Sequence, residues 1–394
     1  MTYNFDEPVS REGTSCVKYD ARKNVFGTDK VIPMWVADMD FECPPVIIKA
    51  LRKRLDHEIL GYTVRREQYF SSLSEWLKRR HSWHIENDWI SFCPGVVPAL
   101  NVCTLAYTEP GDKIIVQPPV YFPFFTAVTD HKRELVYNQL LEEDGIWKID
   151  FADLEKKAAE GARILFLCNP HNPVGRAWTK SELARLADIC LRNDILILSD
   201  EIHSDLILPG HKHTPLASLS QDIAASTITC MAPSKTFNIA GLSTSSVIIS
   251  KPGLKEKFDT AIQSLHITGG NIFGTEASIA AYTSGDKWLD EMLEYVKVNI
   301  EYVLDKFKNN EFIRPVPPEA TYMIWLDCRS MRMAPEELNN FFVNEAGVGM
   351  NEGSVFGPGG EGYMRMNLAC PLDTVKKAVD NIENALLKLK ISNR

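Results

Sequence analysis

The feature that most constrains the fold is the alternation, over residues 86–250, of short apolar runs with amphipathic stretches of helical period. Apolar runs of this length are typical of strands buried on both faces, and a helix between successive runs is how parallel strands are connected. We therefore expect an α/β fold in which helices flank a mainly parallel sheet. The expected strands are 89–93, 113–117, 163–168, 195–199, 226–230 and 245–249, and the expected helices are 45–55, 67–80, 98–107, 121–129 and 181–192.

The pattern changes after residue 285. A long helical stretch at 288–307 is followed by helices and strands in mixed order, which is typical of a smaller α+β domain. Because no linker rich in Pro, Gly or Ser separates the two parts, we expect them to pack together. The expected elements are strands 323–327 and 362–367 and helices 335–344 and 373–389.

Composition excludes several classes of protein. The chain has 52 acidic and 43 basic residues without a basic block that could follow a phosphate backbone, so we expect no nucleic-acid partner. Its nine cysteines form no CxxC pair, which indicates reduced thiols rather than disulfides or a zinc site. Residues 1–20 contain no apolar core of signal-peptide length, and no apolar run approaches the length of a membrane span. We therefore predict a cytoplasmic protein with no membrane partner.

Four motifs follow expected strands, at the position where α/β proteins bind ligands. In the first, residues 95–97 lead a strand into a helix whose free N–H groups could hold a phosphate, although an ordinary strand-to-helix turn has the same pattern. The second contains two Asn-Pro pairs within residues 168–175. This rigid turn aims the amide of Asn172 from the edge of the sheet.

The third and fourth motifs add an acid and a lysine. Asp200 directly follows the run 195–199, and a buried acid is costly unless it meets a cation or a donor. Lys235 follows the run 226–230 among small and apolar neighbours; the alternative is an ordinary solvated lysine. A Schiff-base lysine must lose its proton near neutral pH, and an acid must keep the ring nitrogen of pyridoxal phosphate protonated. Lys235 and Asp200 together match that need.

The order and the spacing of Asn172, Asp200 and Lys235 resemble those of the corresponding residues in the fold-type-I pyridoxal-phosphate enzymes of the class I/II aminotransferase superfamily. The resemblance runs from residue 34 to residue 370 and implies pyridoxal 5′-phosphate as the cofactor. It also implies an aspartate-aminotransferase-like fold with three parts: an N-terminal segment 1–45 that packs with the small domain, a large cofactor-binding α/β/α domain 46–285 and a small C-terminal α+β domain 286–394.

The resemblance assigns roles to individual residues. Lys235 would bond to the cofactor and act as catalytic base, Asp200 would pair with the ring nitrogen, and Asn172 would donate to the ring oxygen O3′. The other implied cofactor contacts are Gly95, Val96, Val97 and Ser234 at the phosphate, Tyr121 stacked on the ring with a further catalytic role, and Tyr62 at the phosphate of a neighbouring subunit. The implied substrate contacts are Arg365, which would hold the carboxylate bidentately, with Ala37, Tyr62 and Asn172.

Two further implications concern the assembly and the phosphate. A Tyr62 that reaches across to a neighbouring subunit implies a homodimer with shared sites. Many aminotransferases of the superfamily have a phosphate-binding arginine eight residues after the lysine, where this chain has Ser243. The phosphate would then depend on the helix N-terminus, on hydroxyl groups and on the partner chain.

Five segments carry a closer likeness within the superfamily: 34–41, 95–97, 200–205, 234–238 and 357–362. In these segments the chain is most similar to the cystathionine β-lyase group of the MalY/PatB type. This likeness implies β-elimination of L-cystathionine or a related L-cysteine S-conjugate to a thiol such as homocysteine, pyruvate and ammonia, with Lys235 as general base. Transamination is an alternative because it uses the same Lys235 and Asp200. A regulatory protein that keeps the fold and the cofactor is a second alternative.

Three histidines lie close together in the sequence and could suggest a metal site: His203, His211 and His213. The run 209–213, however, has the composition of a solvated loop. We therefore expect no metal.

Overall fold

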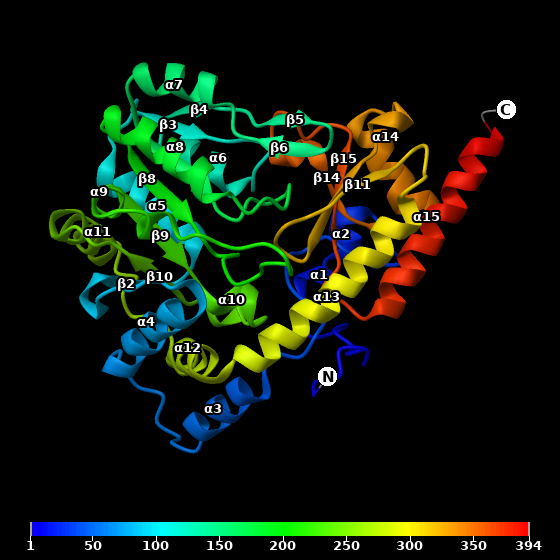
Figure 1. Cartoon of the computed structure of the whole chain (residues 1–394). Helices are drawn as coiled ribbons and strands as arrows, with labels where there is room; N and C mark the ends of the chain where they lie inside the picture. Colours follow the sequence, from blue (N-terminus) through cyan, green and yellow to red (C-terminus); the bar gives the residue numbers. More distant parts are fainter. Residues whose placement is uncertain (1, 393–394) are drawn as a thin grey trace.

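The computed structural model describes residues 2–392, and two sheets organise it. Figure 1 shows the larger sheet and its helices on one side and the smaller sheet on the other, with the long helix α13 (Asp286–Phe307) running along both parts. Within residues 2–392, no helix has both the length and the apolar character needed to cross a bilayer.

The larger sheet has seven strands in the order β2-β10-β9-β8-β7-β3-β4. All neighbouring pairs are parallel except those made by β10, which runs antiparallel to β2 and to β9. The six expected strands are confirmed to within about two residues, and β4 was not predicted. The strands are β2 (Ile90–Cys93), β3 (Lys113–Val116), β4 (Glu134–Tyr137), β7 (Ala162–Cys168), β8 (Leu196–Asp200), β9 (Thr227–Met231) and β10 (Ser245–Ile248).

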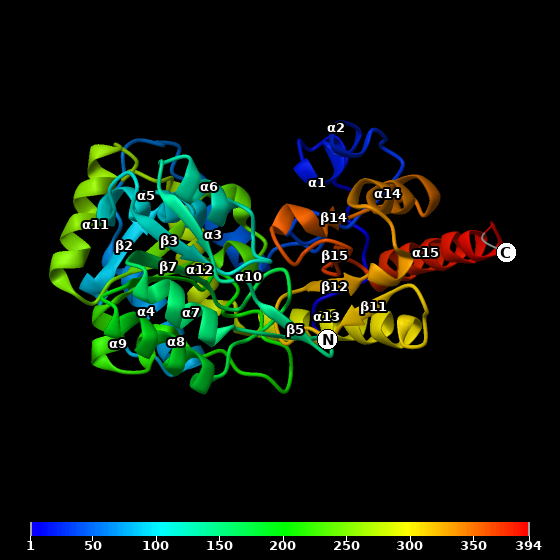
Figure 2. The same ribbon diagram turned by 90° about the horizontal axis from the view of Figure 1, so that it is seen from above.

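Helices cover both faces of this sheet (Figure 2). Alternate strand residues point to opposite faces, so Ile114 and Val116 enter one apolar cluster and Ile115 enters the other. The first cluster also contains residues of α5 (Val96–Tyr107), α6 (Pro123–Thr129) and α11 (Pro252–Ser264). The second contains residues of α7 (Phe151–Ala159) and α8 (Lys180–Arg192). Helix α12 (Ile272–Ser284) packs on α3 (Pro45–Leu55) and α4 (Glu67–His81).

The smaller sheet is antiparallel and has the order β11-β12-β15-β14. The expected helix 335–344 divides in two, because α14 ends at Asn340 and a single wider turn, Phe341–Glu345, follows it. The elements here are β11 (Arg314–Val316), β12 (Met323–Asp327), β14 (Asn351–Glu352), β15 (Tyr363–Asn367), α14 (Pro335–Asn340) and α15 (Leu372–Ser392).

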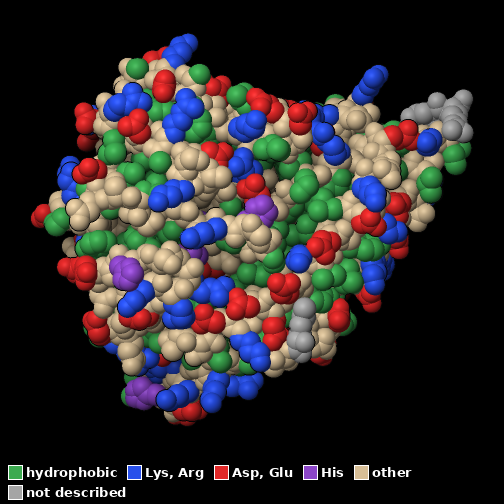
Figure 3. Space-filling model, viewed as in Figure 1, with side chains coloured by type: hydrophobic (Ala, Val, Ile, Leu, Met, Phe, Trp, Pro, Cys, Tyr) green, Lys and Arg blue, Asp and Glu red, His purple; other side chains and the backbone are tan. Residues whose placement is uncertain are grey.

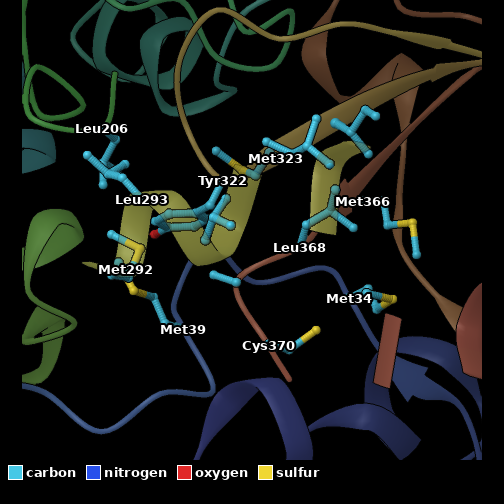
Figure 4. Close-up of a cluster of buried hydrophobic side chains, with 14 of the residues drawn as sticks. Met34, Met39, Leu206, Met292, Leu293, Tyr322, Met323, Met366, Leu368 and Cys370 are labelled. Atoms are coloured by element: carbon cyan, nitrogen blue, oxygen red, sulfur yellow. The ribbon is translucent and has the colours of Figure 1, made fainter. Parts of the chain in front are cut away.

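The N-terminal segment is tied to this second part of the molecule. Strand β1 (Ile32–Pro33) pairs in parallel with β13 (Val348–Gly349), and α1 (Val17–Asp20) and α2 (Arg22–Phe26) lie on the side of the smaller sheet in Figures 1 and 2. Apolar side chains of the segment join residues of α13, β12 and β15 in one buried cluster. Figure 4 labels its members Met34, Met39, Leu206, Met292, Leu293, Tyr322, Met323, Met366, Leu368 and Cys370.

Candidate active site

The candidate residues meet at one edge of the seven-stranded sheet. Asn172 follows β7, Asp200 is the last residue of β8, and Lys235 lies in α10 (Pro233–Thr236) just after β9. Because β7, β8 and β9 are parallel neighbours, their carboxyl ends lie side by side. Strand β2 has the same direction as β9, since both are antiparallel to β10, and it brings Gly95 to this edge.

Lys235 is held by the backbone of the N-terminal segment. Its Nζ donates a hydrogen bond of 2.7 Å to the carbonyl oxygen of Ala37. Burial lowers the pKa of Lys235 to about 8, and the nearby charge of Arg365 acts in the same direction, while Asp38 and Asp200 oppose the shift. Near neutral pH this lysine therefore loses its proton far more readily than a lysine in water.

Asp200 is a buried carboxyl group that lacks a full set of partners. Its Oδ1 accepts a hydrogen bond of 3.0 Å from the backbone N–H of Ile202. Burial raises the pKa of Asp200 to about 7, although that hydrogen bond and the charge of Lys235 favour the ionised form. Its Oδ2 accepts no hydrogen bond from residues 2–392. A cationic ring nitrogen would stabilise the carboxylate.

Arg365 is the buried cation of the site, with 4% of its surface exposed. Its Nη1 donates to Oδ1 of Asn172 at 3.0 Å, and its Nη2 donates to the carbonyl of Trp35 at 2.9 Å and to Oδ1 of Asn351 at 2.7 Å. Among the described residues, its Nε has no hydrogen-bond partner, and no carboxylate forms an ion pair with Arg365. Burial lowers the pKa of Arg365 to about 10. A buried guanidinium without a counter-ion is suited to bind a carboxylate.

The glycine motif provides a site for an anion. Gly95 precedes α5, whose first residues, Val96 and Val97, have no acceptors within the helix for their N–H groups. Ser234 is partly buried in α10, next to Lys235. Ser243 is exposed and has a left-handed backbone conformation, with φ of 45°, at the end of a short turn.

The two tyrosines differ in their placement. Tyr121 is partly buried close to the site, where burial raises its pKa and the charges of Arg365 and Asp200 act on it. Tyr62 is fully exposed in the segment between α3 and α4, so it contacts none of the other candidates within its own chain.

Sequence reasoning missed residues that hold the N-terminal segment in place. Tyr322 donates to the carbonyl of Ala37 at 2.9 Å, and Asn367 donates to the carbonyls of Val36 and Asp38, both at 2.6 Å. Asn367 could have been found, because it lies two residues after Arg365 on the same face of β15. No local pattern marks Tyr322.

The prediction that residues 209–213 form a solvated loop is wrong for the last of them. His213 is buried, and its Nε2 lies 2.8 Å from Oε2 of Glu201. The buried carboxylate of Glu201 needs a partner, and this draws the histidine inward. His203 is also buried, and burial lowers its pKa to about 3. Within residues 2–392, no three His, Cys, Asp or Glu side chains are grouped so that they could hold a metal ion.

The fold and the row of Asn172, Asp200 and Lys235 define an aminotransferase-type α/β protein. The model of the aminotransferase class I and II family matches residues 29–382, and the chain belongs to this family.

Three known proteins are similar over nearly the whole chain. Cystathionine beta-lyase PatB of Bacillus subtilis (strain 168) is 44% identical and covers 97% of this chain and 100% of the relative. Protein MalY of Escherichia coli (strain K12) is 30% identical over 98% of this chain and 99% of the relative. The crystal structure of cystalysin from Treponema denticola, which contains a pyridoxal 5′-phosphate cofactor, is 39% identical, with a TM-score of 0.96 over 99% of this chain and 100% of that chain. The expected likeness to the MalY/PatB group is confirmed.

Proposed function

We propose that this chain is a pyridoxal 5′-phosphate-dependent carbon–sulfur β-lyase. It cleaves L-cystathionine, or a related L-cysteine S-conjugate, with water into a thiol, pyruvate and ammonia. The convergence of a lysine of lowered pKa, a buried carboxyl group and an uncompensated buried guanidinium at one sheet edge supports pyridoxal-phosphate chemistry on an amino acid, which a lyase and an aminotransferase share. The observation that carries the choice of β-elimination is the likeness to the lyases. The 44% identity to a cystathionine β-lyase over 97% of the chain supports it.

The residues at this edge fit the cofactor. Asp200 lacks the cation that a protonated pyridine nitrogen would supply, and the start of α5 offers N–H groups to a phosphate. Oδ1 of Asn172 already accepts from Arg365, which leaves its Nδ2 free to donate to the ring oxygen. When bound, the cofactor ring takes up the electrons left on the substrate after its α-proton is removed.

Two side chains of this protein then act on the substrate. Arg365 binds the α-carboxylate, using the Nε that has no partner within residues 2–392. The neutral amine of Lys235 removes the α-proton as general base, and its lowered pKa makes that form accessible near neutral pH. Tyr121, on which the charges of Arg365 and Asp200 act, would cover the cofactor ring.

We also propose a homodimer in which Tyr62 reaches the site of the partner subunit. The support is the exposure of Tyr62 together with apolar neighbours on the same segment, Ile59, Leu60 and Val64, a group that a second copy would cover. Mixing two inactive variants, Lys235→Ala and Tyr62→Ala, tests it. Mixed dimers with one intact site should regain about a quarter of the activity, and no recovery after subunit exchange would contradict shared sites.

A cytoplasmic location remains a prediction. All nine cysteines lie within the described residues and are free thiols, which is the state expected in a reducing compartment. Figure 3 shows acidic and basic side chains interspersed over one face, without a basic stripe on that face.

The deciding experiment incubates the cofactor-loaded protein with L-cystathionine in the absence of any 2-keto acid and follows pyruvate and free thiol together. Sustained, equimolar release of both, lost in Lys235→Ala, is the expected result. If neither forms, and an added 2-keto acid instead gains an amino group from amino-acid donors, the protein is an aminotransferase. If the protein binds the cofactor and does neither, the regulatory alternative gains support.

A further inference from the structure

The carbonyl oxygen of Ala37 receives two donors from opposite parts of the molecule. Nζ of Lys235 approaches it to 2.7 Å from the edge of the large sheet, and the hydroxyl of Tyr322, the residue just before β12, approaches it to 2.9 Å. A carbonyl oxygen has two lone pairs, so both bonds can form at once. Each donor nevertheless brings a positive hydrogen to the same atom, and the two oppose one another.

This carbonyl has little freedom to turn away from either donor. On its two sides, Asn367 holds the carbonyls of Val36 and Asp38, and Asn238 both donates to the carbonyl of Met39 and accepts from its N–H. The backbone around Ala37 is therefore fixed at each neighbouring peptide unit. The position of the Ala37 oxygen sets where the ammonium group of Lys235 rests.

Tyr322 carries a hydroxyl group where packing alone would not require one. Its side chain is 1% exposed and lies in the apolar cluster of Figure 4, beside residues such as Met292 and Leu293. Burial raises the pKa of Tyr322 far above its usual value, so the hydroxyl stays neutral and remains a donor. A phenylalanine would fill nearly the same space, and a buried hydroxyl is costly without a partner. Its hydrogen-bond partner within residues 2–392 is the Ala37 carbonyl.

We propose that Tyr322 is a positioning residue for Lys235, acting through the Ala37 carbonyl that the two side chains share. The proposal rests on the proposed function for its catalytic meaning. By occupying one lone pair, the hydroxyl limits how strongly the carbonyl can stabilise the ammonium form of Lys235. When the lysine turns toward the substrate, the hydroxyl keeps its own bond to this fixed carbonyl, so the ammonium formed by proton removal returns to an acceptor that is already shared.

Other groups face Lys235 and remain unchanged when Tyr322 is altered. Arg365 approaches from β15, Asp200 from the end of β8, and Asp38 from the N-terminal segment, while His203 lies in the turn after β8. Any shift in the titration of Lys235 caused by Tyr322→Phe then reports the lost hydroxyl.

The test compares Tyr322→Phe with a control variant, Tyr107→Phe. Tyr107 is partly buried, and its hydroxyl also donates to a backbone carbonyl, that of Leu254, at 2.7 Å. In each full-length protein freed of cofactor, the acetylation rate of Lys235 by acetic anhydride is measured against pH by peptide mass spectrometry. Tyr322→Phe should raise the pKa of Lys235 by about half a unit, roughly a threefold loss of neutral amine below that pKa. Tyr107→Phe should leave it unchanged.

The cofactor-loaded variants give a second measurement. In Tyr322→Phe the rise of kcat with pH should move upward in the same direction, with KM changed less than about twofold. An unshifted acetylation profile in a protein that keeps its melting temperature overturns the proposal. Because acetylation does not depend on lyase activity, a wild-type protein inactive on L-cystathionine would contradict the proposed function and still leave this measurement decisive.

Discussion

Nη1 of Arg365 donates a hydrogen bond of 3.0 Å to Oδ1 of Asn172, and this bond links β15 of the smaller sheet to the turn after β7 of the larger one. The proposed carboxylate-binding residue and the proposed ring-contacting residue are thus fixed to one another across the two parts of the molecule. A substrate that binds Arg365 is thereby held in register with the lysine edge of the large sheet.

Arg365→Lys should lower kcat/KM for L-cystathionine about 10- to 100-fold, mainly through KM, because an ammonium cannot replace the planar fork that binds Asn172, Trp35 and a carboxylate together. Steady-state kinetics check this expectation. Arg329→Lys is the matched control, since Arg329 lies in a half-exposed cluster with Asp327 and should leave the kinetics unchanged. Equal kinetic losses in both variants would remove Arg365 from its proposed role.

Lys235→Met should stabilise the cofactor-free protein at pH 7, by on the order of 1–3 kcal/mol. The folded-state pKa of Lys235, about 8, lies below the value of 10.5 for a lysine in water, so the unfolded chain binds more protons between these values. The contribution of Lys235 to stability is therefore present above pH 10.5 and lost as the pH falls through 8. Urea unfolding from pH 7 to pH 10.5 should show the two proteins converging at the upper end; parallel curves would contradict the lowered pKa.

Asp200→Asn should change the pH dependence of stability in the direction opposite to that expected for Lys235→Met. The pKa of Asp200, about 7 in the folded protein, lies above its ordinary value of 3.8, so stability from this group is present below pH 3.8 and lost as the pH rises through 7. The melting temperature of the cofactor-free Asp200→Asn variant should therefore fall less than that of the wild type between about pH 5 and pH 8. Identical slopes would show that Asp200 is ionised throughout that range.

The sequence predicted the large sheet well, because both faces of its central strands are buried and their apolar runs are easy to recognise. It could not give the direction of β10, since a strand buried on both faces has the same composition whichever way it runs. Strand β4 was missed because it is short and Glu134 and Tyr137 are exposed on it. Because β4 is only partly buried, its sequence lacks the apolar run by which the other strands were recognised.

The candidate site was predictable to the extent that its residues follow strands. Asn172, Asp200 and Lys235 each come within five residues of the end of an apolar run, and parallel strands bring such positions together. The contacts of Ala37 with Lys235 and Tyr322 join residues that are 198 and 285 positions apart in the sequence, and no local pattern encodes them. The inward turn of His213 likewise depends on a charge, Glu201, whose burial only the packed structure reveals.

His213→Ala should lower the free energy of unfolding by about 2–4 kcal/mol at pH 7, because it leaves the fully buried carboxylate of Glu201 without one of its three partners. Denaturant unfolding measures the loss. His211→Ala, two residues earlier and exposed, is the control and should change the stability by less than about 0.5 kcal/mol. A loss below about 1 kcal/mol for His213→Ala would mean that Glu201 is satisfied without it.

The ties on the segment around Ala37 also order the events of biosynthesis. A chain that has been made only as far as residue 320 already contains Ala37, Lys235 and every strand of the large sheet. It lacks Tyr322, Arg365 and Asn367, which fix the segment in place. The large sheet can thus form on the ribosome while its lysine edge stays uncovered, and the edge closes only after residues 321–367 have also emerged.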